Sequence, residues 1–304
     1  MIRRHLKASL EALLILGGVA ALARRVNVHR GCVLAYHNII PEGEEPVGDR
    51  SLHLPVQQFR AQLDHLVETY EVVPLDALLR PPDRPPRRPR VAITFDDAYR
   101  GAITCGVAEL RARGLPATVF VSPAFIGGRS FWWDSLASGT QGLDEELRSH
   151  ALTALRGVDA EIRRWAAEAG IAEATVPAYA RAASEEELAR ALEHPGLSLG
   201  SHTWSHPNLV RLSAAELATE LELPMRWLRE RFERVLPWLS YPYGMTSPEV
   251  EAAVARAGYA AALRVTGGPL PRGGTQRYAL PRINIPAGSS RRGFALRTAG
   301  IIRE

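Results

Sequence analysis

Short apolar runs alternate along this chain with stretches in which apolar residues recur at helical spacing. The runs with the length of buried strands occupy residues 32–36, 91–95, 117–121, 197–199, 236–241 and 259–264. The helical stretches cover residues 59–67, 108–113, 213–232 and 248–257. Strand, helix and strand at this spacing imply right-handed crossovers between parallel strands, so the pattern predicts an α/β fold, a β/α barrel in a single domain.

Two segments depart from this alternation. Prolines and arginines alternate over residues 80–90, which predicts an exposed loop with neither helix nor strand. A later region is rich in alanine, glutamate and arginine, and in it Ser184 precedes Glu187 at the spacing of a capping box. We therefore expect a helical insertion at about residues 140–195, within a domain that spans residues 31–304.

The first 30 residues stand apart from this domain. Basic residues precede and close an apolar run at residues 12–23, which is the form of a secretion signal. The run is too short for a membrane span, which needs about 20 apolar residues. Glu11 at its edge fits the alternative, an amphipathic helix packed on the domain. Both interpretations stay open; we expect membrane association through residues 1–25, and we favour the cell envelope or another extracytoplasmic location over the cytoplasm.

Composition and charge narrow the class of protein. The chain has 304 residues, of which 46% are hydrophobic and 23% charged, as in globular proteins. Its 37 basic and 33 acidic residues nearly cancel, so we expect no nucleic-acid partner. Cys32 and Cys105 are far apart and lie in or beside apolar stretches, which predicts neither a disulfide nor a thiolate metal site.

Candidate chemistry follows the predicted strands. Asp96 and Asp97 come directly after residues 91–95, at the strand end where barrel enzymes place reactive groups. His202 and His206 come after another strand, and on a helical turn their four-residue spacing would let both rings share a metal. One carboxylate and two imidazoles form a ligand set that leaves positions open for water and substrate. Taken singly, an Asp pair also fits a turn or a helix cap, and two histidines at this spacing also arise by chance.

A third motif, residues 240–244, follows the extended segment 236–241. Two tyrosines around Pro242, with a glycine after them, predict a rigid loop. Such a loop can stack on a sugar ring and direct a backbone N–H at a developing oxyanion. A plain aromatic turn is the alternative for this motif taken alone.

The three motifs, in this order, resemble those of the polysaccharide deacetylase family, also called the NodB-homology or carbohydrate esterase family 4 domain. They are Thr94-Phe95-Asp96-Asp97, Ser201-His202 with His206, and Tyr241-Pro242-Tyr243-Gly244. The resemblance runs from about residue 31 to residue 286. It implies a distorted (β/α)7 barrel and metal-dependent removal of acetyl groups from a poly- or oligosaccharide of the N-acetylglucosamine type, or from a glycan precursor.

The resemblance also assigns roles to individual residues. It implies that Asp96 is the general base, that Asp97, His202 and His206 bind the metal, and that the backbone N–H of Tyr243 lines the oxyanion hole. Zinc is the metal we expect, although cobalt, nickel and iron accept the same ligands.

The chain departs from the family pattern at two places. Ser240 stands where the family usually carries an arginine that orients the base, and Arg282 is the candidate to replace it from another strand end. No histidine follows His206, so the usual C-terminal general acid is absent. His37, at the end of the first predicted strand, is the candidate acid, as in the circularly permuted branch that includes the poly-N-acetylglucosamine deacetylases; a structural, hydrogen-bonded histidine is the alternative.

Further residues are candidates for holding the sugar. Trp133 and Asp134 follow the second family strand and suggest a platform with a polar contact, with core packing as the alternative for one of the two tryptophans in Trp132-Trp133. We group them with Pro242, Tyr243 and Arg282 as substrate-binding candidates. Two other functions stay open: a glycan-binding module that has lost turnover, and a metal-dependent hydrolase of a non-sugar amide.

Overall fold

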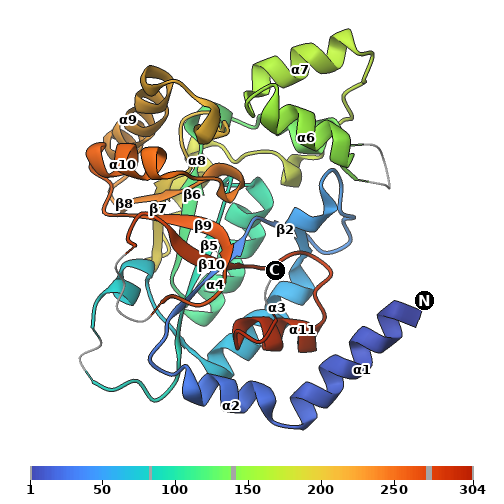
Figure 1. Cartoon of the computed structure of the whole chain (residues 1–304), viewed down its shortest axis with the longest axis vertical. Coiled ribbons are helices and arrows are strands. Elements are labelled where there is room, and N and C mark those ends of the chain that lie inside the picture. Colours follow the sequence, from blue (N-terminus) through green and yellow to red (C-terminus); the bar gives the residue numbers. More distant parts are fainter. Residues whose placement is uncertain (1, 82–83, 138–141, 272–275, 303–304) are drawn as a thin grey trace.

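The strands predicted from the apolar runs form the wall of a barrel. A computed structural model describes residues 2–81, 84–137, 142–271 and 276–302. Within these residues, seven parallel strands close into a ring (Figure 1). In ring order they are β1 (Cys32–Tyr36), β5 (Arg90–Phe95), β6 (Ala117–Val121), β7 (Leu197–Ser201), β8 (Val235–Ser240), β9 (Ala261–Gly267) and β10 (Leu280–Asn284). The predicted α/β barrel of the (β/α)7 type is confirmed.

The place of β1 in the ring brings its C-terminal end next to that of β5. β1 is the first strand in the chain, and it pairs with both β10 and β5. In a chain that began at β5, the last strand would hold this place between β10 and β5. The arrangement is therefore circularly permuted. Tyr36 lies opposite Phe95 in the register, and the Asp96 N–H donates to the Tyr36 carbonyl at 2.9 Å. His37 and Asp96 therefore leave the barrel side by side.

Helices cover the outside of the ring. They are α3 (Val56–Thr69), α4 (Val107–Arg113), α9 (Ala214–Arg231), α10 (Pro248–Arg256) and α11 (Arg291–Thr298). Hydroxyl caps fix where they begin: Ser213 and Glu216 form a capping box at α9, while Ser247 and Ser290 cap α10 and α11. The helices expected at residues 213–232 and 248–257 are present with nearly these bounds.

The segment between β6 and β7 carries its own helices. These are α5 (Trp132–Ser135), α6 (Glu145–Thr153), α7 (Asp159–Glu168) and α8 (Glu185–Ala191). Ser184 and Glu187 cap α8 reciprocally, as their spacing predicted. In Figure 1, α6 and α7 project beyond the barrel. Residues 140 and 141 of the expected insertion lie outside the described residues.

Two short strands have no counterpart in the apolar pattern. β2 (Asn38–Ile40) and β3 (His53–Pro55) form a separate parallel pair, and with three residues each they are too short to show a period. The apolar run at residues 72–75 predicts a short extended piece, and β4 (Glu71–Val72) overlaps its start and adds to the beginning of β5. The predicted loop at residues 80–90 has no helix or strand among its described residues until Arg90 begins β5.

Two helices precede the barrel, α1 (Ile2–Leu16) and α2 (Val19–Val26). One side of this pair packs against α11, where Ala20, Leu296 and Ala299 are buried together. Among the described residues, none of the helices combines the length and the apolar character needed to cross a bilayer.

Candidate active site

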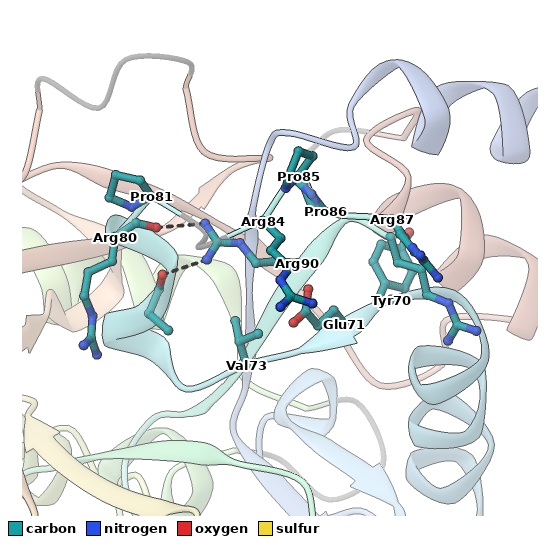
Figure 2. Close-up of a pocket in the computed structure, with 12 residues that line it drawn as sticks. Tyr70, Glu71, Val73, Arg80, Pro81, Arg84, Pro85, Pro86, Arg87 and Arg90 are labelled. Carbon is teal, nitrogen blue, oxygen red and sulfur yellow. Dashed lines mark hydrogen bonds between the residues drawn. The ribbon is translucent and has the colours of Figure 1, made fainter.

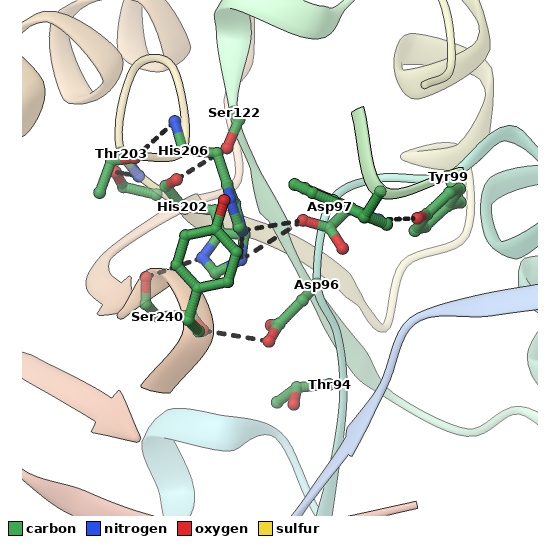
Figure 3. Close-up of polar contacts among 12 residues, drawn as sticks. Thr94, Asp96, Asp97, Tyr99, Ser122, His202, Thr203, His206 and Ser240 are labelled. Carbon is green, nitrogen blue, oxygen red and sulfur yellow. Dashed lines mark hydrogen bonds and ion pairs between the residues drawn. The ribbon is translucent and has the colours of Figure 1, made fainter. Parts of the chain in front are cut away.

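Asp97, His202 and His206 direct their side chains at one point (Figure 3). The Asp97 Oδ1 lies 3.3 Å from the His206 Nε2 and 3.5 Å from the His202 Nε2, and the two Nε2 atoms are 3.1 Å apart. Ligand atoms bound about 2.1 Å from one ion at tetrahedral or octahedral angles lie about 3.0–3.4 Å apart. The three residues therefore fit a metal ion, with Asp97 and both histidines on one side of it.

The protonation of these groups supports the same interpretation. The His202 Nδ1–H donates to the Ser240 carbonyl at 2.7 Å, which leaves the Nε2 as a lone-pair donor for a metal. Burial lowers the pKa of both histidines and so favours the neutral, ligating form. Burial and the neighbouring Asp96 carboxylate raise the pKa of Asp97 well above its ordinary value, and its Oδ1 has no hydrogen-bond partner. A bound cation would supply the missing positive charge.

The two histidines meet through a loop and not through a helical turn, because residues 202–206 are not helical. Thr203 and His206 have positive φ angles, and the Thr203 hydroxyl accepts from the His206 N–H at 3.0 Å. Glu220, buried on α9, accepts from the N–H groups of Trp204 and Ser205. The expectation that a helical turn brings the two histidines together was wrong, because the hydrogen bonds of Thr203 and Glu220 shape this loop instead.

Asp96 faces a different partner. Arg282, fully buried on β10, donates to both its carboxylate oxygens, at 2.8 Å and 2.6 Å. The Ser240 hydroxyl donates to the Asp96 Oδ2 at 3.2 Å and accepts from Arg282. Burial favours the protonated acid, but Arg282 outweighs it and holds the pKa of Asp96 below its ordinary range. The Arg282 guanidinium thus reaches the Asp96 carboxylate beside Ser240, whose small side chain leaves space for it.

His37 completes this group from the end of β1. It is half-buried, whereas Asp96 and Asp97 are each 2% exposed. Burial lowers the pKa of His37 to about 4, although the Asp96 carboxylate acts in the opposite direction. The imidazole is therefore neutral at pH 7 before a reaction begins.

The 240–244 motif lies against the metal-ligand cluster. The ring of the half-buried Tyr243 packs edge-on to His206, with centroids 4.6 Å apart, and Pro242 is buried beneath it. Tyr243 has a φ of 57°, a left-handed conformation that costs a non-glycine residue about 1–3 kcal/mol. Of the six such residues in the described chain, five belong to the site: Asp97, Ala98, Thr203, His206 and Tyr243. Backbone strain is therefore concentrated where the chemistry is expected.

Trp133 and Asp134 do not form an exposed sugar platform. Trp132 and Trp133 are 1% and 3% exposed, and Asp134 is 2% exposed. The Trp133 ring packs against His206 at 4.8 Å, and its indole N–H donates to the Tyr99 hydroxyl at 2.7 Å. The expectation of a solvent-facing platform is corrected, because the aromatic cluster behind the histidines encloses both indoles.

Asp134 belongs to a buried chain of hydrogen bonds that the sequence did not reveal. Tyr99 donates to one Asp134 oxygen at 2.7 Å, and the His53 Nε2 contacts the other at 2.9 Å. Asn38 donates to the His53 Nδ1 at 3.0 Å, which leaves the proton on Nε2. From Tyr99 the hydrogen bonds continue to the Trp133 indole, whose ring packs against His206. A polar His53 inside the apolar sequence of β3 was the only signal, and it names no partner.

We expect His53→Ala to weaken metal binding by up to about 10-fold, because His53 reaches His206 only through Asp134, Tyr99 and Trp133. The variant removes a donor from the buried Asp134 and loosens the contacts behind His206. His194→Ala is the matched control: His194 is 3% exposed and bonds the Leu115 carbonyl instead. Both variants should lose a similar stability of about 1–3 kcal/mol. Equal metal affinities in a competition titration would contradict the supporting role of His53.

Comparisons with known proteins identify the family to which this chain is similar. A sequence model of the family described as polysaccharide deacetylase matches residues 83–262. The candidate polysaccharide deacetylase YxkH of Bacillus subtilis is 24% identical over 265 residues, which are 86% of this chain and 74% of that protein. A chitooligosaccharide deacetylase of Bradyrhizobium is 35% identical over 80 residues, 26% of this chain and 36% of that protein.

A solved structure shares the fold. The Streptococcus pyogenes deacetylase PplD, in complex with acetate, aligns with a TM-score of 0.60 at 17% identity, and the alignment covers 88% of this chain and 98% of that one. At this identity the likeness concerns the barrel alone.

Proposed function

Because the chain belongs to the polysaccharide deacetylase family, we propose that it hydrolyses the N-acetyl groups of an N-acetylglucosamine poly- or oligosaccharide to a free amine and acetate. The observation that carries the proposal is the juxtaposition of two units. One is the convergent Asp97, His202 and His206 cluster, and the other is the buried Asp96 carboxylate held by Arg282. The relative that acts on chitooligosaccharides supports the substrate class.

A divalent metal, zinc by preference, would be held by Asp97, His202 and His206. When bound, it would polarise the acetamide oxygen and lower the pKa of a water molecule toward about 7. The two imidazoles and one carboxylate leave coordination positions free for this purpose. Cobalt, nickel and iron accept the same ligands.

Asp96 would act as the base. Its pKa is held low, so the carboxylate is ionised at neutral pH and can take a proton from the attacking water. Arg282 and the Ser240 hydroxyl fix its orientation by contacts on both oxygens. The backbone N–H of Tyr243 would stabilise the oxyanion, a contact typically worth about 3–4 kcal/mol.

His37 would deliver a proton to the departing nitrogen. Since its imidazole is neutral at the start, the proton must arrive during the reaction. Asp96, which leaves the adjacent strand beside His37, is the group that has just taken one from water. The water proton would thus pass by way of Asp96 and His37 to the amine, and acetate keeps the water oxygen.

Acetate release from β-1,6- and β-1,4-linked N-acetylglucosamine oligomers tests the proposal. The purified chain, reconstituted with zinc, cobalt or nickel, should release acetate from one or both. Asp96→Asn and His37→Ala should each slow this release by about 10²- to 10⁴-fold, the range for a general acid or base. Val210→Ser, an exposed position outside the site, is the control and should retain full activity.

Other outcomes point elsewhere. Saccharide binding without acetate release, with metal bound, would favour a glycan-binding module. Acetate release only from non-sugar amides would favour a metal-dependent hydrolase of a non-sugar amide. Arg282 weakens the first of these. That function drew support from the missing arginine at position 240 and from the missing C-terminal histidine, and a buried guanidinium contacts Asp96 all the same.

A further inference from the structure

Exposed apolar side chains gather on the two N-terminal helices. Nine large hydrophobic residues of the described chain are exposed, and six of them lie within α1 and α2 or at their ends. Their exposed fractions run from 37% to 84%. The six are Leu10, Leu13, Leu16, Val19, Leu22 and Val26; we call them the apolar face. Such a face on a folded protein usually marks a binding surface.

The fold itself turns these side chains outward. The opposite side of the helix pair is fixed to the domain: Ala20 is buried against α11, and Glu11 is only 5% exposed and accepts a hydrogen bond from Ser290 at 2.6 Å. Figure 1 shows α1 and α2 along the edge of the molecule beside α11. Because Glu11 holds this orientation, the apolar face cannot be hidden against the barrel without breaking that contact.

Positive charge surrounds the same end of the molecule. Arg24 and Arg25 lie in the last turn of α2, and Arg291 and Arg292 are exposed at the start of α11. The loop at residues 80–90 adds further arginines around an open hollow of about 1180 Å³ (Figure 2).

This arginine loop is a neighbour of α2. Arg24 and Asn27 line one small cavity together with Pro89 of the loop. The charges of the loop and of the helices therefore belong to one surface. Among the described residues, Glu71 is the acidic residue that lines this hollow.

We propose that the apolar face and the arginine loop together bind the surface of an anionic lipid bilayer, with α1 and α2 lying in the plane of the membrane. Apolar side chains flanked by arginines are the features of helices that insert shallowly while their cations contact lipid headgroups. An in-plane position also agrees with helices of 15 and 8 residues, too short to span the bilayer.

This mode of binding orients the barrel. The arginine loop precedes Arg90, where β5 begins, whereas Asp96 and Asp97 follow the residue where β5 ends. The candidate active site therefore lies at the end of the barrel away from the bilayer. A membrane-bound chain would present its site to a polymer outside the lipid surface.

Vesicle flotation of the full chain tests this inference. The protein should float with vesicles that contain about one third phosphatidylglycerol, less with phosphatidylcholine alone, and less at high salt because exposed charges are screened. Leu13→Ser combined with Leu16→Ser should reduce binding at least tenfold. Both residues are exposed, so this variant should fold normally and keep its activity on soluble oligomers.

Two further variants separate the contributions. Arg84→Gln combined with Arg87→Gln should reduce the preference for anionic vesicles, while the matched control Val210→Ser should bind like the wild type. Equal flotation of the double-serine variant, or none by the wild type, would overturn the inference. So would a dimer that the double-serine change converts to a monomer without any vesicle binding, because that result assigns the apolar face to a second copy. None of these readouts depends on deacetylation.

Discussion

Asp97→Asn is expected to abolish metal binding and acetate release while making the metal-free protein more stable. Asp97 provides one of three convergent ligand atoms, so its loss should cost more than the 10- to 100-fold typical of a supporting residue. The gain in stability has a separate cause. Burial and Asp96 raise the folded pKa of Asp97, so in the metal-free chain this carboxyl lowers stability as pH rises above its unfolded pKa of about 3.9.

The measurement is thermal unfolding at pH 7 with and without zinc. Without zinc, wild type should unfold at a lower temperature than Asp97→Asn. Added zinc should raise the unfolding temperature of wild type, because a ligand that binds only the folded state stabilises it. The unfolding temperature of Asp97→Asn should not change with zinc. Asp64→Asn, an exposed residue paired with Arg113, is the control and should behave like wild type. A zinc response retained in Asp97→Asn would refute the ligand assignment.

Arg282→Met is expected to destabilise the chain by about 3–5 kcal/mol, because it leaves the Asp96 carboxylate buried without its partner. The direction of this stability change follows from the lowered pKa of Asp96. A carboxyl whose folded pKa is depressed adds stability above its unfolded pKa and loses it as pH falls through the folded value. Without Arg282, burial dominates, so the pKa of Asp96 rises. The acid limb of the activity profile should move toward neutral pH.

The double variant Asp96→Asn with Arg282→Met separates the charge from the packing. It removes both charges, so it should recover much of the stability lost in Arg282→Met while staying inactive. Chemical denaturation of wild type, Arg282→Met and the double variant measures this directly. If the double variant were no more stable than Arg282→Met, or if the pH profile of Arg282→Met did not shift, Arg282 would be a packing residue only.

The sequence predicted the barrel and the places where its chemistry gathers, because a buried strand has a short apolar run and a polar motif marks its end. Residues 91–95 followed by Asp96 and Asp97 are an example. β10 was harder to find, since Arg282 interrupts its apolar character and is nevertheless fully buried. The Asp96 carboxylate that follows β5 supplies the charge partner for this buried guanidinium, and the two residues are far apart in the chain.

Other features depend on contacts that no local pattern contains. A tryptophan pair has the same sequence signal whether it faces a sugar or a core, and Trp133 packs inward because His206 and Tyr99 come from other elements. The N-terminal run similarly fitted either a secretion signal or a packed helix. In the structure Glu11 ties it to Ser290, while Leu13, Leu16 and Leu22 remain exposed.

The central claim is that one metal ion, held by Asp97, His202 and His206, serves deacetylation by Asp96. The most direct test removes all metal with a chelator and returns zinc in steps, with bound zinc and acetate release measured on each sample. Activity should disappear with the metal, return in proportion to bound zinc, and reach its maximum at one ion per chain. Acetate release that persists in the metal-free protein, or zinc that binds fully at this site without restoring release, would contradict it.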